Sequence, residues 1–215
     1  MRNRLTLLLL APCCGGLSLP PLPPLDRPAE LVATHGFSGA ANWLVPGHVM
    51  LGANPTKGRG SAVERLRALR RDAAVTTFVS LQEMSEERDG GYADDARSVL
   101  VDAPAPAFAR YEIQDLRPAP SLEWLADTVG ELAARVRAGE VLYVHCFAGR
   151  GRAGLVGASL LGELYEGVGG DEALERVGAY YRLRAGYDVA SSRAQDGRSP
   201  ETEPQRQQVR DFLAR

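Results

Sequence analysis

The stretch that decides the fold spans residues 141–154 and reads VLYVHCFAGRGRAG. Its first four residues are β-branched, aliphatic or aromatic, which predicts a short buried strand. Beyond residue 154, apolar side chains recur at spacings of three and four, which predicts a helix; they are Leu155, Val156, Ala158, Leu160, Leu161 and Leu164. A glycine-rich loop joins the two elements, so the pattern is strand, tight loop and helix N-terminus.

The loop, residues 146–152 and here called the phosphate loop, combines the features of an anion site. Its backbone N–H groups can all point inward, and the helix N-terminus adds positive potential. Arg152 adds a planar fork that can hold two oxygens of a phosphate. Cys146 would lie beneath the bound phosphorus, and the same positive field stabilises a thiolate, the nucleophilic form of cysteine.

His145-Cys146, five residues and then Arg152 resemble the His-Cys-x5-Arg signature of the cysteine-dependent protein tyrosine and dual-specificity phosphatases. The resemblance implies that Cys146 forms a cysteinyl-phosphate and that Arg152 holds the phosphoryl group, with no metal or other cofactor. The expected substrate-binding residues of the loop are His145, Phe147, Ala148, Gly149, Arg150 and Gly151. We expect His145 to shape the loop by hydrogen bonds rather than to act as a base.

One position departs from the family's pattern. The arginine is usually followed by Ser or Thr, whereas this chain has Ala153. In the family that hydroxyl helps the thiolate to leave when the phosphoenzyme is hydrolysed. We therefore expect Ala153 to affect hydrolysis of the cysteinyl-phosphate more than its formation.

The expected general acid is Asp115. Residues 108–113 alternate like a strand and residues 114–120 break it, and a carboxylic acid on such a loop can give the departing oxygen a proton. The family's aspartate follows a strand and lies one helix and one strand ahead of the nucleophile. Asp115 fits, because Ser121 is expected to cap a helix that runs to residue 138. Asp102 precedes the strand and is the second choice; a structural turn aspartate is the other interpretation of Asp115.

Two other interpretations of the loop remain open at this stage. Gly149, Gly151 and Gly154 match the Gly-x-Gly-x-x-Gly dinucleotide fingerprint. That interpretation requires a second strand after the helix, ending in an acidic residue, but residues 171–177 predict another helix instead. The alternative is a structural strand-turn-helix around a buried cysteine. Arg150 and Arg152, both within six residues of the cysteine, argue against an inert core site.

The composition of the chain limits which partners, disulfides and metal sites are expected. The chain has 215 residues and a formal net charge of −2, which gives no reason to expect a nucleic-acid partner. Of its three cysteines, Cys146 alone lies in the expected domain, so no disulfide framework is expected. The three histidines are scattered along the chain, and no metal site is expected from them. The sequence leaves the oligomeric state open.

Residues 1–28 are expected to be a targeting peptide or a disordered leader, and residues 29–215 the phosphatase domain. Arg2 and Arg4 precede a short apolar run, and a proline-rich linker follows from residue 20. The run falls short of twenty continuous apolar residues, so no spanning helix is expected. Such a segment suggests organelle or secretory targeting, and a cytoplasmic location if it is not a signal.

The remaining elements predict an α/β fold, a short central mixed sheet flanked by helices, with the phosphate loop at the carboxyl end of the 140–145 strand. Residues 42–55 resemble the Trp-x-x-Pro-Gly hairpin of dual-specificity-like phosphatases. Ser61 is expected to cap a helix, residues 75–81 to form a buried strand and residues 82–95 a polar loop. Asp171 should cap a helix to about residue 185, and the final helix should span 201–215 with Pro200 in its entry.

The expected substrate is a phosphorylated protein, carrying phosphotyrosine, phosphoserine or phosphothreonine. Arg150 adds a second charge to the phosphate loop, which resembles the basic loops of lipid and inositol-phosphate phosphatases. A phosphoinositide or inositol phosphate is therefore the second choice. A phosphate-binding module with little turnover is the third, because Ala153 replaces the hydroxyl.

Overall fold

The computed structural model describes residues 18–57, 61–86, 96–97, 105–184 and 197–215. Within them, strands pair into one mixed sheet in the order β1-β2-β5-β3-β4. The strands are β1 (Ala41–Val45), β2 (Val49–Ala53), β3 (Thr77–Ser80), β4 (Ala107–Arg110) and β5 (Leu142–Cys146). β1 and β2 are antiparallel, whereas β5 is parallel to both β2 and β3 and β4 is parallel to β3. The predicted short mixed sheet with 140–145 at its centre is confirmed.

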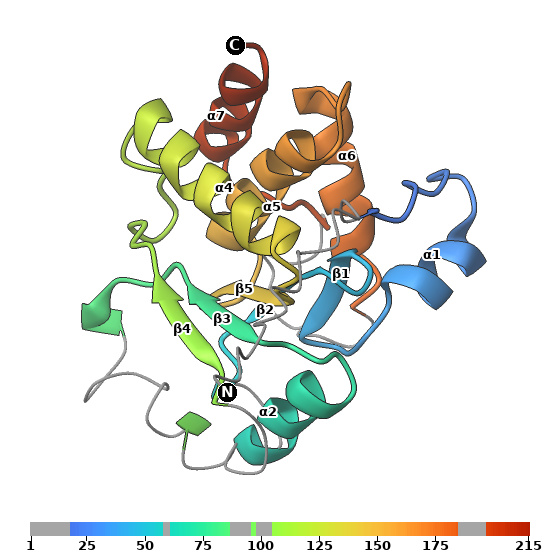
Figure 1. Cartoon of the computed structure of the whole chain (residues 1–215). Helices are drawn as coiled ribbons and strands as arrows, with labels where there is room; N and C mark the ends of the chain where they lie inside the picture. Colours follow the sequence, from blue (N-terminus) through green and yellow to red (C-terminus); the bar gives the residue numbers. More distant parts are fainter. Residues whose placement is uncertain (1–17, 58–60, 87–95, 98–104, 185–196) are drawn as a thin grey trace, which may run out of the picture.

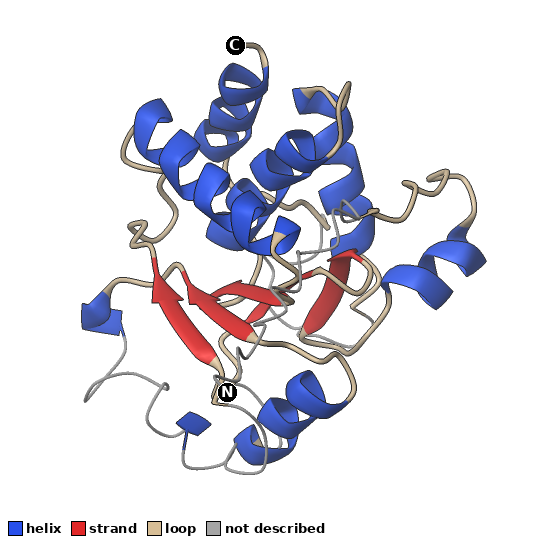
Figure 2. Cartoon of the chain, in the orientation of Figure 1, coloured by secondary structure: helices blue, strands red, loops and turns tan. Residues whose placement is uncertain are grey.

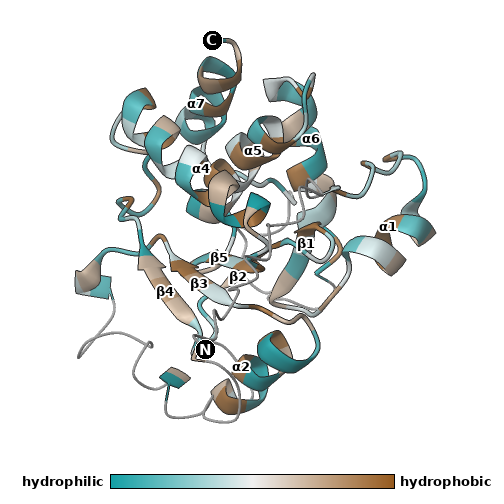
Figure 3. Ribbon diagram, in the orientation of Figure 1, coloured by the Kyte–Doolittle hydropathy of each residue, from teal (hydrophilic) through white to brown (hydrophobic). Residues whose placement is uncertain are grey.

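Helices cover both faces of the sheet (Figures 1 and 2). On one face lie α4 (Leu122–Arg137), α5 (Gly151–Leu164), α6 (Gly170–Tyr181) and α7 (Glu203–Leu213), and their apolar side chains form the larger core. On the other face lies α2 (Ala62–Arg71), which covers a smaller core around Phe78 and Tyr143. Hydrophobic and hydrophilic residues alternate along α2 (Figure 3), and its Leu66 and Leu69 are buried. The short helix α1 (Pro28–His35) precedes β1, and the 3-10 turn η1 (Met84–Glu86) follows β3.

The direction of the strands determines where the predicted site lies. Because β2, β5 and β3 run in the same direction, their carboxyl ends meet at one edge. Cys146 is the last residue of β5 and pairs in register with Ala53, the last residue of β2. The phosphate loop starts at this edge and leads directly into α5.

Several local predictions are confirmed. The 42–55 hairpin forms, and its turn includes Gly47 at a φ of 78°. Ser61 caps α2 by accepting a hydrogen bond from the backbone N–H of Glu64. Ser121 caps α4 in the same way, with the N–H of Trp124 as the donor at 3.1 Å.

Two helix boundaries differ from the prediction. α6 starts two residues earlier, because Gly169 takes the extended N-cap conformation and Asp171 lies in the first turn; the helix ends at Tyr181. α7 is capped by Thr202, which forms a capping box with Gln205, and the proline of its first turn is the one at position 204. Pro200 lies ahead of the cap.

Residues 18–27 lie against the domain, although the proline-rich composition from residue 20 onward had suggested a linker. The hydroxyl of Tyr165 donates to the carbonyl of Pro20 at 2.8 Å, and Arg176 donates to the carbonyl of Pro23 at 2.8 Å. Leucine side chains of this segment pack on the larger core. The domain boundary at residue 28 stays a prediction, and residues 1–17 lie outside the described part. No helix in the described ranges has the length and apolar character needed to cross a membrane.

Candidate active site

The phosphate loop is held from behind by β2. The backbone N–H of Asn54 donates to the carbonyl of Phe147 at 3.1 Å. Gly149 has a φ of 69°, and a Cβ there would lie 2.3 Å from the carbonyl oxygen of Gly52. Glycine is therefore required at 149, both for its dihedral angle and for this close approach. Cys146, the first residue of the loop, is a free cysteine and is 3% exposed.

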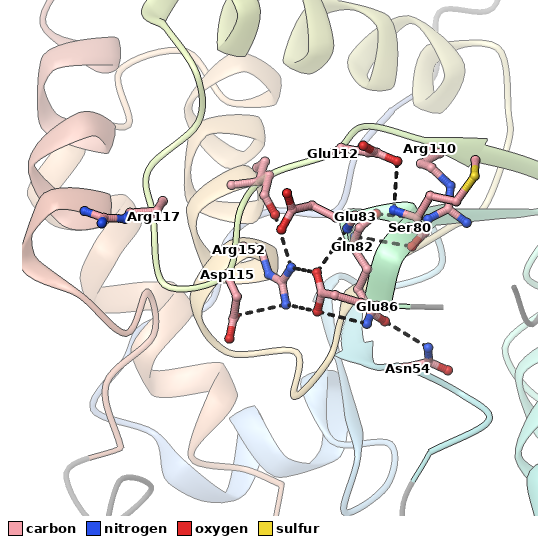
Figure 4. Close-up of polar contacts among 12 residues, drawn as sticks. Asn54, Ser80, Gln82, Glu83, Glu86, Arg110, Glu112, Asp115, Arg117 and Arg152 are labelled. Atoms are coloured by element: carbon pink, nitrogen blue, oxygen red, sulfur yellow. Dashed lines mark hydrogen bonds and ion pairs between the residues drawn. The ribbon is translucent and has the colours of Figure 1, made fainter. Parts of the chain in front are cut away.

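Arg152 is buried in the first turn of α5, with 1% of its side chain exposed. Nη1 donates to Oε1 of Glu86 and to the carbonyl of Ile113, the latter at 3.1 Å. Nη2 lies 3.0 Å from Oε2 of Glu86 and 3.0 Å from Oδ1 of Asp115 (Figure 4). A guanidinium has five N–H groups, and three of the contacts are hydrogen bonds from its two terminal nitrogens, while the contact with Asp115 is an ion pair. The N–H on Nε is buried and has no hydrogen-bond partner among the described residues.

Glu86 is the main anchor of Arg152, and it is itself held by other groups. Its Oε1 accepts from the backbone N–H of Glu83 at 3.0 Å, and its Oε2 accepts from Nε2 of Gln82 at 3.3 Å. Gln82 in turn accepts from Nδ2 of Asn54 at 2.8 Å. Burial alone would raise the pKa of Glu86, but the hydrogen bonds and charge of Arg152 hold it below its ordinary value. The pair is therefore an ionised, charge-assisted contact.

Asp115 lies on the turn between β4 and α4, as predicted. Its side chain is 63% exposed and points toward Arg152 (Figure 4). Leu116, the next residue, has a φ of 62° and is 42% exposed. The structure thus brings Asp115 and Arg152 together, while the second-choice acid Asp102 lies outside the described residues.

His145 is fully buried below the loop. Burial lowers its pKa to about 3, and the positive charges of Arg110 and Arg152 act in the same direction against a backbone hydrogen bond with Cys146. The imidazole is therefore neutral at neutral pH. This is compatible with the predicted shaping role for His145.

Arg150 is turned toward another part of the chain. Its Nε donates to the carbonyl of Arg198 at 2.7 Å, and Nη1 lies 3.6 Å from Oε1 of Glu201. The hydroxyl of Ser199 donates to the carbonyl of Arg150 at 2.8 Å. The predicted contact of this side chain with substrate stays a prediction, and what the structure gives Arg150 is a link to the segment before α7.

A family model described as the Swiss Army Knife protein, DSP-PTPase phosphatase domain, matches residues 39–209. The chain belongs to this family. No curated protein sequence matches it.

Solved phosphatase structures share the fold. PTPMT1 in complex with PI(5)P is 20% identical, with a TM-score of 0.58 over 81% of this chain and 94% of that chain. Tk-PTP in the active form is 23% identical, with a TM-score of 0.57 over 82% of this chain and 97% of that chain. Human DUSP28 is 18% identical, with a TM-score of 0.55 over 84% of this chain and 97% of that chain. The family match and this fold support a cysteine-based phosphatase.

The dinucleotide interpretation of the loop is wrong for this phosphatase. After α5 the described residues 165–184 and 197–215 form helices and turns without a strand, so the second half of a Rossmann unit is missing from them. Gly154, the last glycine of that pattern, instead faces Ser199, whose Oγ would lie 2.3 Å from an added Cβ.

Glu86, which accepts hydrogen bonds from both terminal nitrogens of Arg152, was not predicted from the sequence. It lies in the 82–95 stretch, which was interpreted as a polar loop with no residue singled out. An acidic residue shortly after a buried strand parallel to the nucleophile strand was the available signal, because both strands end at the same edge. The rest of that stretch, residues 87–95, lies outside the described part.

Proposed function

We propose that this phosphatase hydrolyses phosphate monoesters with Cys146 as the nucleophile, Arg152 as the phosphate ligand and Asp115 as the general acid and base. The loop residues 147–151 supply backbone N–H groups to the equatorial oxygens. His145 supports the loop from below. The metal-free chemistry that the sequence implies is part of the proposal.

The observation that carries the proposal is the Nε–H of Arg152. It is a buried donor without a protein acceptor in the described residues, on the side chain six residues after Cys146. Leaving such a donor unsatisfied costs about 1–3 kcal/mol, and more when it is charged. An oxyanion bound in the phosphate loop satisfies it, while Glu86 and Ile113 keep the rest of the guanidinium in place.

The reaction then has two steps. In the first, the Cys146 thiolate attacks phosphorus, the bond to the leaving oxygen breaks, and protonated Asp115 gives that oxygen its proton. In the second, the Asp115 carboxylate takes a proton from water, the water oxygen attacks phosphorus, and the P–S bond breaks. Inorganic phosphate leaves, and the thiolate and the protonated acid are restored. Asp115 must leave Nη2 of Arg152 to reach the leaving oxygen, and its 63% exposure gives it room to move.

The first-choice substrate is a phosphorylated protein, above all one carrying phosphotyrosine. Two apolar side chains flank the catalytic residues in the chain: Phe147, 55% exposed, follows Cys146, and Leu116, 42% exposed, follows Asp115. Exposed apolar side chains of this size favour contact with an aromatic or apolar leaving group. Arg150, the residue that had suggested a more highly charged substrate, is engaged by Arg198 and Glu201.

A phosphoinositide is the alternative, because PTPMT1, which shares the fold, was crystallised with PI(5)P. The test is to compare kcat/KM for a phosphotyrosine peptide, a phosphoserine peptide and PI(5)P under one set of conditions. We expect the phosphotyrosine peptide to give the highest value. A value at least tenfold higher for PI(5)P would favour the alternative.

One comparison distinguishes an enzyme from a phosphate-binding module with little turnover. Wild type and Cys146→Ser are assayed with 4-nitrophenyl phosphate, and binding of inorganic phosphate is measured for both. We expect turnover by wild type and none by the variant, with phosphate binding retained in both. Equal rates in the two proteins would contradict the enzymatic proposal and favour the binding module.

A further inference from the structure

Arg184 lies in the turn after α6 and is buried against the back of the phosphate loop, with 6% of the residue exposed. Its Nε donates to Oδ1 of Asn42 at 2.6 Å, its Nη1 to the carbonyl of Gly149 at 3.0 Å, and its Nη2 to the carbonyl of Leu51 at 2.8 Å. β1, β2 and the phosphate loop therefore converge on one guanidinium. The proposed mechanism gives this residue no role.

The contact with Gly149 fixes one peptide plane of the loop. The peptide between Gly149 and Arg150 is trans, so the carbonyl of Gly149 and the N–H of Arg150 point in opposite directions. The carbonyl faces Arg184, and the N–H therefore faces the other side of the loop. The backbone of Gly149 is also pressed against Gly52, which leaves the peptide little room to turn over.

We propose that Arg184 is a positioning residue of the phosphatase: it holds the Gly149 carbonyl outward so that the Arg150 N–H points at the phosphoryl oxygens. The inference rests on the proposed function of the loop as a phosphate site. A guanidinium suits this place because its rigid fork offers donors in several directions at once. A lysine ammonium is a compact charge on a flexible stem and cannot reproduce three such contacts.

The same contacts also tie β1 to β2, so a merely structural role has to be separated from positioning. A structural role predicts lower stability with unchanged chemistry in the molecules that remain folded. Positioning predicts weaker anion binding and slower turnover in folded protein, because one preorganised oxyanion donor is worth about 10²–10³ in kcat.

The experiment compares Arg184→Met and Arg184→Lys with Arg182→Met in the full-length chain. Arg182 is an exposed arginine of the same turn and serves as the control. Turnover of 4-nitrophenyl phosphate gives kcat and KM separately. Titration with inorganic phosphate in the Cys146→Ser background gives anion affinity without chemistry. Circular dichroism and thermal unfolding report how much protein is folded at the assay temperature.

We expect both Arg184 variants to lose at least tenfold in kcat and at least tenfold in phosphate affinity per folded molecule, and Arg182→Met to match wild type. Arg184→Lys keeps the charge, so it tests the positioning role if Arg184→Met does not fold. Folded Arg184→Lys within twofold of wild type in both quantities would overturn the inference, as would an equal loss in Arg182→Met. An inactive wild type would instead remove the proposed function itself.

Discussion

Oδ1 of Asp115 lies 3.0 Å from Nη2 of Arg152, so the proposed acid and the proposed phosphate ligand contact each other directly in the free protein (Figure 4). Glu86 accepts hydrogen bonds from both Nη1 and Nη2 of the same guanidinium. The two carboxylates differ in exposure, at 63% for Asp115 and 22% for Glu86. Asp115, the more exposed of the two, is suited to move during the reaction, and the less exposed Glu86 is suited to stay in place.

Asp115→Asn should lower kcat by about 10²–10⁴, because an amide cannot give the leaving oxygen a proton. The loss should be smaller for 4-nitrophenyl phosphate than for an alkyl phosphate, since nitrophenolate leaves without much help. Steady-state kinetics with both esters measures this. Asp127→Asn, on the exposed side of α4, is the matched control and should match wild type. Equal losses for both esters would contradict the acid role.

Glu86→Gln should lower kcat/KM by at least tenfold and stability by about 1.5–3 kcal/mol, the usual worth of hydrogen bonds to charged groups. Gln has one acceptor oxygen where the carboxylate has two, so Nη1 and Nη2 of Arg152 cannot both be held. Urea unfolding and steady-state kinetics measure the two effects. Glu83→Gln, three residues earlier, is the control. It keeps the backbone N–H that donates to Glu86, so kcat/KM and the free energy of unfolding should both stay close to the wild-type values.

The stability gained from Glu86 should depend on pH. The pKa of the Glu86 carboxyl in the folded protein lies below its ordinary value of 4.5. The stabilisation by Glu86 is therefore complete at pH values above 4.5 and is lost as the pH falls through the pKa of the folded state. The difference in unfolding free energy between wild type and Glu86→Gln should therefore be constant from about pH 8 to 5 and shrink below about 4.5. A difference that grows on acidification would show that the pair is not ionised.

Ala153→Ser should speed hydrolysis of the cysteinyl-phosphate without changing its formation. The new hydroxyl would lie one residue after Arg152, where it can donate to the departing thiolate. Rapid-quench kinetics should show a burst in wild type that is reduced in the variant, with a faster steady state. Ala158→Ser adds the same hydroxyl farther along α5 and serves as the control. A steady rate that is unchanged by Ala153→Ser would count against this account.

His35→Phe should make stability less sensitive to acid. His35 stacks on Tyr180 with ring centroids 3.9 Å apart, and burial, aided by the charge of Arg176, lowers its pKa from 6.5 to about 4. The unfolded chain therefore binds this proton first, and wild type should lose about 3 kcal/mol between pH 6.5 and 4. Phe keeps the stacking and cannot titrate.

The His35 test uses the difference between the two proteins, because His145 is also buried neutral and contributes a loss of the same sign. Urea unfolding at several pH values should give curves that diverge below about pH 6.5. Parallel curves for wild type and His35→Phe down to pH 4 would contradict the prediction.

Much of the fold could be predicted because the sequence signals are local. Residues 141–144 are an apolar run typical of a buried strand, and residues 155–164 have the apolar spacing of a helix. Ser61 and Ser121 are side-chain caps whose partners lie three residues away. The start of α6 was misjudged because Gly169 caps through its backbone conformation alone, while Asp171 is the residue with a capping side chain. The proline-rich segment from residue 20 was predicted to be a linker, because its contacts with Tyr165 and Arg176 are with residues distant in sequence.

By itself the sequence determined the strand, loop and helix that form the phosphate loop, and it predicted Cys146 as the nucleophile and Arg152 as the phosphate ligand, because these residues are contiguous in the chain. Only the tertiary structure decided what holds that loop. Glu86, Asp115 and Arg184 come from three separate segments, and they meet the loop because parallel strands end at one edge and the turn after α6 packs behind it. Ion pairs and hydrogen bonds between residues far apart in the sequence depend on how whole helices and strands pack. A local sequence pattern therefore cannot predict them.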